Sequence, residues 1–240
     1  MSLKEKNKLI RKVNSLLLKR FGKPYRNKKL PDPVDLLIAT ILSQNTNDAN
    51  SYKAYRNLKN QYPDWKKLLK VPVEKIERLI KVAGLGKQKS RAIKNFVNSV
   101  YEEKSDINLD FVNGMNDLTA IKKLTEYKGV GVKTASCVLL FAFDKDVCPV
   151  DTHVHRTVNR IGIVRASTPD KTFYMLNEKF PKGIAHSFHT NLIRLGREIC
   201  KPKNPSCGIC PLNEICEFDK KNLGNNSGNE SKSFMLLDNV

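Results

Sequence analysis

The sequence predicts an all-α protein. Apolar residues recur at steps of three and four along most of the 240 residues, and no run alternates strictly between apolar and polar side chains. The segment closest to a strand, Val147–Val150, is too short and contains Pro149. Hydrophobic residues make up 40% of the chain, which is enough for a packed helical core.

The expected helices follow one another through short connections. The first carries an apolar stripe from Leu9 to Phe21, and two prolines separate it from a short buried helix at Val34–Leu42. Thr46 or Asn47 can cap the next helix. Further helices are expected at Trp65–Leu69, Val73–Val82, Lys87–Val100, Asp117–Leu124, Val132–Phe143, Thr152–Ile163, Asp170–Phe180 and Ile184–Ile199.

The chain is strongly basic. Its 43 Lys and Arg against 24 Asp and Glu give a net charge of +19, and residues 1–29 hold eleven basic residues against one acidic residue. Such an excess indicates a polyanionic partner, nucleic acid rather than a membrane surface. A solubilising surface or a lysine-rich compositional bias is the alternative. No membrane helix or secretory signal is recognisable, so we expect a soluble, intracellular protein.

Four of the six cysteines are clustered, at Cys200, Cys207, Cys210 and Cys216. Nothing suggests secretion, so metal binding is favoured over disulfide formation. Zinc ribbons pair their ligands in two separated C-x-x-C knuckles, whereas this run has one such pair and prolines that favour an irregular loop. An iron–sulfur cluster is therefore favoured, with zinc as the alternative. Cys137 and Cys148 are expected in the core.

A glycine-rich turn, Gly129-Val130-Gly131, joins two of the expected helices. Its backbone N–H groups and the positive end of the following helix dipole can bind a phosphate. Lys133 follows in the first helical turn, where a cation is disfavoured but an amine that attacks in its neutral form is well placed. A plain packing element is the alternative for this turn.

Asp151 precedes the helix expected from Thr152. Its ordinary explanation is an N-cap, because Asp is among the preferred residues there. With an amine nucleophile nearby, the same carboxylate can instead orient the amine and handle protons.

Three motifs together resemble the helix-hairpin-helix DNA glycosylases, and most closely their endonuclease III group. They are Lys128-Gly-Val-Gly-Val-Lys-Thr-Ala, Val150-Asp-Thr-His-Val-His-Arg and the C-x6-C-x2-C-x5-C run, which agree with the family in order and spacing. The resemblance extends from about Leu36 to Phe218. It implies that the four clustered cysteines bind a [4Fe–4S] cluster.

The resemblance also implies two helical domains with a cleft between them. A central helical-barrel domain at 29–140 would contain the helix-hairpin-helix. A discontinuous cluster domain at 141–221 would be completed by the N-terminal helix within residues 1–28. Residues 222–240 are poor in apolar groups and are expected to form a disordered tail. Within it, Phe234–Leu237 is either an inert terminus or a short docking motif.

Residue roles follow from the resemblance position by position. Lys133 matches the catalytic lysine of bifunctional enzymes, and Asp151 matches the catalytic aspartate, the two facing each other across the cleft. Gly129, Val130 and Gly131 match the hairpin that grips the DNA backbone.

Two further positions match residues that enter the DNA helix. Gln44 matches the residue that fills the gap left by a flipped base, and Leu85 matches the wedge in the opposite strand. Without the resemblance, Gln44 would be interpreted as a helix end and Leu85 as ordinary core. The chain departs from the family pattern at Lys128, Val132 and Gly86, which usually hold proline, arginine and an aromatic residue. These departures leave the lesion preference open.

The function implied is that of a bifunctional DNA glycosylase and AP lyase of base excision repair. It would remove oxidised pyrimidines through a lysine Schiff base and β-elimination. The expected partner is duplex DNA with a damaged base or an abasic site, bound by a monomer in the cytoplasm and nucleoid, or in the nucleus of a eukaryote. A monofunctional mismatch glycosylase acting on thymine or adenine, which Lys133 disfavours, and a non-catalytic DNA-binding module are the alternatives. The excess charge of residues 1–29 suggests a second DNA contact on the N-terminal helix.

Overall fold

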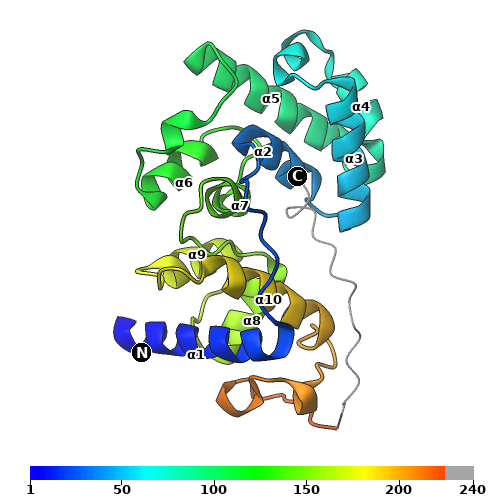
Figure 1. The fold of residues 1–240 in the computed structure, drawn as a ribbon. Helices are drawn as coiled ribbons and strands as arrows, with labels where there is room; N and C mark the ends of the chain where they lie inside the picture. Colours follow the sequence, from blue (N-terminus) through cyan, green and yellow to red (C-terminus); the bar gives the residue numbers. More distant parts are fainter. Residues whose placement is uncertain (225–240) are drawn as a thin grey trace. The chain divides into compact units, whose positions relative to one another are not determined.

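The computed structural model describes residues 1–224, which form two compact units (Figure 1). One unit is Asn27–Lys145, and the other joins Met1–Arg26 to the described residues from Asp146 to Gly224. Every regular element in these residues is a helix, which confirms the expected fold class. Over the same part of the chain, no helix combines the length and the apolar character needed to cross a membrane. Most of the expected tail, including Phe234–Leu237, lies outside the described residues.

The unit at Asn27–Lys145 is built around two buried helices, α2 and α7. α2 is buried from Leu36 to Leu42 because its sequence is apolar on all sides, and α7 packs on it with a buried stretch from Thr134 to Ala142. Asp32 caps α2 by accepting hydrogen bonds from the N–H groups of its first turn. The α-helices of this unit are α2 (Pro33–Leu42), α3 (Asp48–Gln61), α4 (Val73–Ile80), α5 (Gly86–Lys104), α6 (Asp117–Thr125) and α7 (Val132–Ala142). Its 3₁₀ helices are η1 (Trp65–Lys70), η2 (Lys81–Ala83) and η3 (Asp110–Val112).

The second unit is built around α10, which packs against both α1 and α8. The apolar stripe of α1 is fully buried at Ile10, Val13 and Leu17. The hydroxyl of Ser187 on α10 donates to the side-chain oxygen of Asn14, a polar link between these two helices. The helices are α1 (Leu3–Phe21), α8 (Thr152–Ile161), α9 (Pro169–Asn177) and α10 (Ala185–Glu198), followed by the 3₁₀ helices η4 (Cys207–Ile209) and η5 (Asn213–Ile215).

The main difference from the expected helices is at the end of α5. This helix continues to Lys104, one turn beyond the expected end at Val100. The added turn, Tyr101–Lys104, has no buried residue, so the apolar periodicity that predicts helices stops before the helix does.

Candidate functional site

The glycine-rich turn between α6 and α7 lies tightly against α5. The N–H of Val130 donates to the carbonyl of Tyr127 at 2.9 Å and closes the turn. Gly129 has a left-handed backbone, with φ of +95°, and a Cβ placed there would lie 2.5 Å from the Cβ of Ala92. Glycine is therefore required at this position both for its backbone conformation and for its close contact with α5.

The other two residues of the turn have different environments. Val130 is buried and holds the turn to the core. Gly131 is exposed and precedes α7 without a capping side chain, and a Cβ placed there would meet nothing within 4 Å. The free N–H groups of the first turn of α7 are thus open to an approaching anion, which suits a phosphate.

Lys133 is half-buried in this first turn of α7. No other described residue of its unit forms a hydrogen bond or ion pair with its Nζ, in contrast to Lys94 and Lys145, whose ammonium groups donate to backbone carbonyls. The amide of Gln44, just beyond the end of α2, donates to the hydroxyl of Thr134 at 3.4 Å. The fold therefore brings Gln44 next to the residue that follows Lys133.

Leu85 is not the ordinary core residue that its sequence context suggests. It is 49% exposed and has a left-handed backbone, with φ of +49°. A side chain in this conformation costs roughly 1 kcal/mol, so the surrounding structure must impose it. Gly84, also left-handed, precedes Leu85, and α5 begins directly after it at Gly86. The turn presents a large apolar side chain to solvent.

Asp151 is the N-cap of α8, as its sequence context predicts. Its Oδ1 accepts a hydrogen bond from the N–H of Val154 at 2.7 Å. Its Oδ2 has no hydrogen-bond partner among the described residues of its own unit, so the cap leaves one carboxylate oxygen for other chemistry. Lys133 and Asp151 belong to different units, and their meeting across a cleft stays a prediction.

The segment before Asp151 is held by two side chains that the sequence motifs do not include. Asn177 on α9 accepts from the N–H of Cys148 at 2.7 Å and donates to its carbonyl at 3.0 Å. The Nδ1 of His189 lies 3.0 Å from the carbonyl of Pro149, and it must be the donor because a carbonyl only accepts. His189 is buried on α10. These contacts fix the backbone two and three residues before Asp151.

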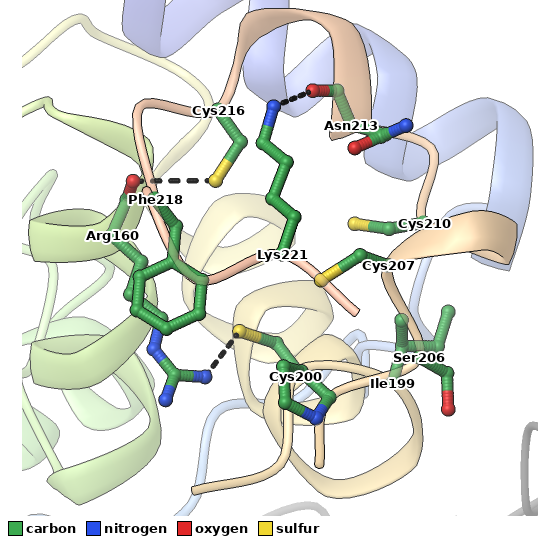
Figure 2. A pocket seen from close by; sticks show the side chains of 11 residues that line it. Arg160, Ile199, Cys200, Ser206, Cys207, Cys210, Asn213, Cys216, Phe218 and Lys221 are labelled. Carbon is green, nitrogen blue, oxygen red and sulfur yellow. Dashed lines mark hydrogen bonds between the residues drawn. The ribbon is translucent and has the colours of Figure 1, made fainter. Parts of the chain in front are cut away.

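The four clustered cysteines line one pocket after α10. Figure 2 shows their sulfur atoms turned toward a shared space. The loop is folded by short local hydrogen bonds, such as that from the N–H of Cys210 to the carbonyl of Cys207 at 3.2 Å. All four are free thiols, whereas Cys137 and Cys148 are buried in the core as expected.

Four thiolates from one loop can bind a [4Fe–4S] cluster, in which each thiolate binds its own iron. Burial raises the pKa of the Cys210 thiol to about 12 and raises that of Cys216, so binding of iron must displace protons from both.

The sequence comparisons give two family matches. Residues 38–182 match the HhH-GPD superfamily of base excision DNA repair proteins, and residues 200–216 match the iron–sulfur binding domain of endonuclease III. The second match confirms the expectation of an iron–sulfur cluster rather than zinc. The chain is 36% identical over 213 residues to endonuclease III of Thermotoga maritima, covering 89% of this chain and 94% of the relative. It is 32% identical to endonuclease III of Bacillus subtilis over 200 residues, or 80% and 86% of the two chains.

Solved structures give the same picture. A trapped covalent intermediate of endonuclease III with DNA superposes with a TM-score of 0.72 at 30% identity, covering 88% of this chain and 95% of that one. A thermostable thymine-DNA glycosylase superposes with a TM-score of 0.73 at 22% identity, covering 91% and 99%, which is a likeness of fold.

Proposed function

Because this chain belongs to the HhH-GPD superfamily of base excision DNA repair proteins, and within it to the endonuclease III group, we propose that it removes oxidised pyrimidines from duplex DNA and cleaves the abasic site that results. The chain is a DNA glycosylase and AP lyase with a [4Fe–4S] cluster, and DNA is its partner. The alternatives, a monofunctional mismatch glycosylase and a non-catalytic DNA-binding module, are not favoured by these relatives. The observation that carries the proposal is the half-buried amine of Lys133, which has no partner in its own described unit, at the N-terminus of α7.

Base excision begins with extrusion of the damaged nucleotide, because its glycosidic bond is inaccessible within the stack. Extrusion costs a few kcal/mol. Leu85, exposed on its strained turn, offsets part of this cost by entering the opposite strand, and Gln44 occupies the gap. The open backbone N–H groups at Gly131 and at the start of α7 hold a phosphate of the strand that carries the damaged nucleotide.

The neutral amine of Lys133 then attacks C1′ of the extruded nucleotide, and the bond from C1′ to the base breaks, with the base leaving with the bonding electron pair. Asp151 stabilises the positive charge that develops on the sugar and accepts the proton that the amine loses. Opening of the sugar ring gives a Schiff base between Nζ and C1′. Removal of a proton from C2′ then expels the 3′ phosphate by β-elimination, which cuts the strand 3′ to the lesion.

We assign Cys200, Cys207, Cys210 and Cys216 as the ligands of the cluster. When bound, the cluster cross-links a loop whose only regular elements are two 3₁₀ turns. The reaction steps above require no electron transfer, so the cluster has a structural role in this proposal.

The nucleophile is tested by borohydride trapping on a duplex with a single abasic site. The parent should form a covalent adduct and nick the strand, and Lys133→Ala should lose both while its affinity for the duplex changes less than about tenfold. Lys122→Ala, which removes an exposed lysine on α6, is the matched control and should trap as the parent does. An adduct that persists in Lys133→Ala would move the nucleophile to another lysine.

The substrate class is tested with duplexes that each carry one lesion: an oxidised pyrimidine, an oxidised purine, a mispaired thymine or a mispaired adenine. Single-turnover excision should be fastest on the oxidised pyrimidine. A faster rate on any of the other three would overturn the substrate assignment while leaving the lyase chemistry intact.

A further inference from the structure

Lys89 is a buried cation in the first turn of α5. Its side chain is 1% exposed, and burial lowers its pKa to about 8. No Asp or Glu among the described residues forms an ion pair with it. The N-terminal end of a helix also disfavours a cation. A buried ammonium in such a place is costly unless it has strong hydrogen-bond partners.

Its partners are two backbone carbonyls from separate segments. The Nζ donates to the carbonyl of Leu42 at 2.8 Å and to that of Ala83 at 2.9 Å. Leu42 is the last residue of α2, and Ala83 is the last residue of η2. Carbonyls at helix ends lack intrahelical partners and lie at the negative end of the helix dipole. One ammonium therefore satisfies the ends of two helices at once.

Each of these carbonyls lies two residues before a side chain assigned to the DNA gap. Leu42 precedes Gln44, with one residue between them, and Ala83 precedes Leu85 in the same way. Gly84, with its left-handed backbone, begins the exposed turn directly after Ala83. The cation thus fixes the starting points of both DNA-facing segments relative to each other.

Lys94 on the same helix is a lysine whose two acceptors belong to a single element. Its Nζ donates to the carbonyls of Leu68 and Leu69, at 2.6 and 2.8 Å, which are neighbours within η1. Lys94 therefore caps a single helix, whereas Lys89 joins two.

We propose that Lys89 is a positioning residue that couples Gln44 to Leu85, so that the two side chains enter the duplex as one unit. This inference rests on the roles proposed above for those two residues. In a coupled pair, loss of one side chain misplaces the other, so the two contributions to lesion binding depend on each other.

The test is a double-mutant cycle on affinity for a duplex with a tetrahydrofuran abasic-site analogue. Gln44→Ala, Leu85→Ala and the double variant are compared in the parent and in the Lys89→Met background. In the parent, the fold-loss of affinity of the double variant should be at least about threefold smaller than the product of the fold-losses of the two single variants. With Lys89→Met, which keeps length and removes the charge, the losses should simply multiply.

The controls separate coupling from general destabilisation. The cycle in the Lys94→Met background should keep the parent's non-additivity, and Lys89→Arg, which retains a cationic donor, should recover at least part of it. Undiminished non-additivity with Lys89→Met would overturn the coupling while leaving the roles of Gln44 and Leu85 intact. If neither single truncation weakens binding in the parent, both those roles and the coupling are overturned.

A measurement on the unmodified protein covers the case in which Lys89→Met does not fold. Native-state hydrogen exchange should show the hydrogen-bonded amides of Ser43, Gln44 and Gly84 opening with one common free energy and one denaturant dependence. Two distinct openings would overturn the coupling. The tetrahydrofuran duplex is not needed for this measurement, so its result does not depend on the proposed function.

Discussion

The guanidinium of Arg160 donates a hydrogen bond to the sulfur of Cys200, with 3.4 Å between Nη1 and Sγ. It also donates to the carbonyls of Lys201 and Pro202, and its Cζ lies 4.2 Å from the centre of the Phe218 ring (Figure 2). Arg160 is near the end of α8, and Asp151 caps the start of that helix. One ten-residue helix therefore joins the cysteine loop to the proposed catalytic carboxylate.

Asp151→Asn should distinguish the role of Asp151 as the N-cap of α8 from its proposed catalytic role. Asn is as good an N-cap as Asp, so thermal stability should change by less than about 1 kcal/mol. Asn cannot accept a proton or stabilise a developing cation as a carboxylate does, so single-turnover excision should slow by about 10²–10⁴-fold. A variant that loses stability but keeps its excision rate would reduce Asp151 to a helix cap.

The cluster assignment predicts that the purified protein is yellow-brown and contains about four irons per chain. Cys210→Ser should lose most of this iron and its colour, because serine is a poor ligand for iron in such clusters. Cys137→Ala, in the buried part of α7, is the control and should retain both. Iron is measured by elemental analysis, and a colourless, zinc-loaded protein with full activity would contradict the assignment.

Glu103 predicts a pH dependence for the stability of the unit at Asn27–Lys145. Hydrogen bonds from Lys104 and Lys123, and one from the hydroxyl of Tyr127 just before the glycine-rich turn, lower its pKa from 4.5 to about 2. A lowered carboxyl pKa means that the stabilisation is complete above pH 4.5 and is lost as the pH falls toward 2. Because the ion pairs of Glu103 with Lys104 and Lys123 are partly exposed, they contribute about 0.5–1 kcal/mol to the free energy of unfolding.

Glu103→Gln should therefore be less stable than the parent at pH 7 and should approach it at pH 3. Urea unfolding, followed by the fluorescence of Trp65, measures this stability difference. Trp65 is the single tryptophan of the chain and lies in the same unit as Glu103. A stability difference that is equal at both pH values would show that the charge of Glu103 is not its cause.

The basic residues of α1 predict a salt-dependent contribution to DNA binding. Lys8, Lys12 and Lys19 are exposed, whereas the apolar stripe of the same helix is buried. Replacing these three lysines with Glu leaves the buried stripe unchanged. If they contact phosphates, the slope of log K against log salt concentration should fall by about 2–3, since each contact contributes about 0.9.

The matched control reverses three exposed lysines of the other unit, Lys67, Lys70 and Lys122. The control variant has the same net charge as the α1 variant. A smaller change in slope in the control would show that the effect of the α1 lysines comes from local phosphate contacts and not from net charge. An unchanged slope in the α1 variant would assign its charge to solubility.

The helices and the cysteine loop were predictable because each has a local signal. The periodicity of apolar residues predicts the helix that ends at Phe21. The glycine-rich turn predicts the start of α7 at Val132. The end of α5 was missed because its last turn has no buried residue. The local sequence pattern therefore predicts a helix only over the part that buries an apolar face.

The contacts that support the site were not predictable from one sequence. Lys89 is one of many lysines, and only the fold brings the carbonyls of Leu42 and Ala83 to it. Nothing near His189 in the sequence marks it as a partner for Pro149, forty residues away. The exposure of Leu85 likewise depends on a turn conformation that a leucine rarely adopts.

The division of one unit between the two ends of the chain determines the order of folding during synthesis. Asn14 on α1 meets its partner Ser187 only after a further 173 residues have been added, which takes about 10–35 s at ribosomal rates. The unit at Asn27–Lys145 is continuous and can fold within that interval. Until α9 and α10 emerge, the apolar face of α1 lacks most of its partners in its own unit and needs protection from aggregation, to which the surrounding lysines contribute by mutual repulsion.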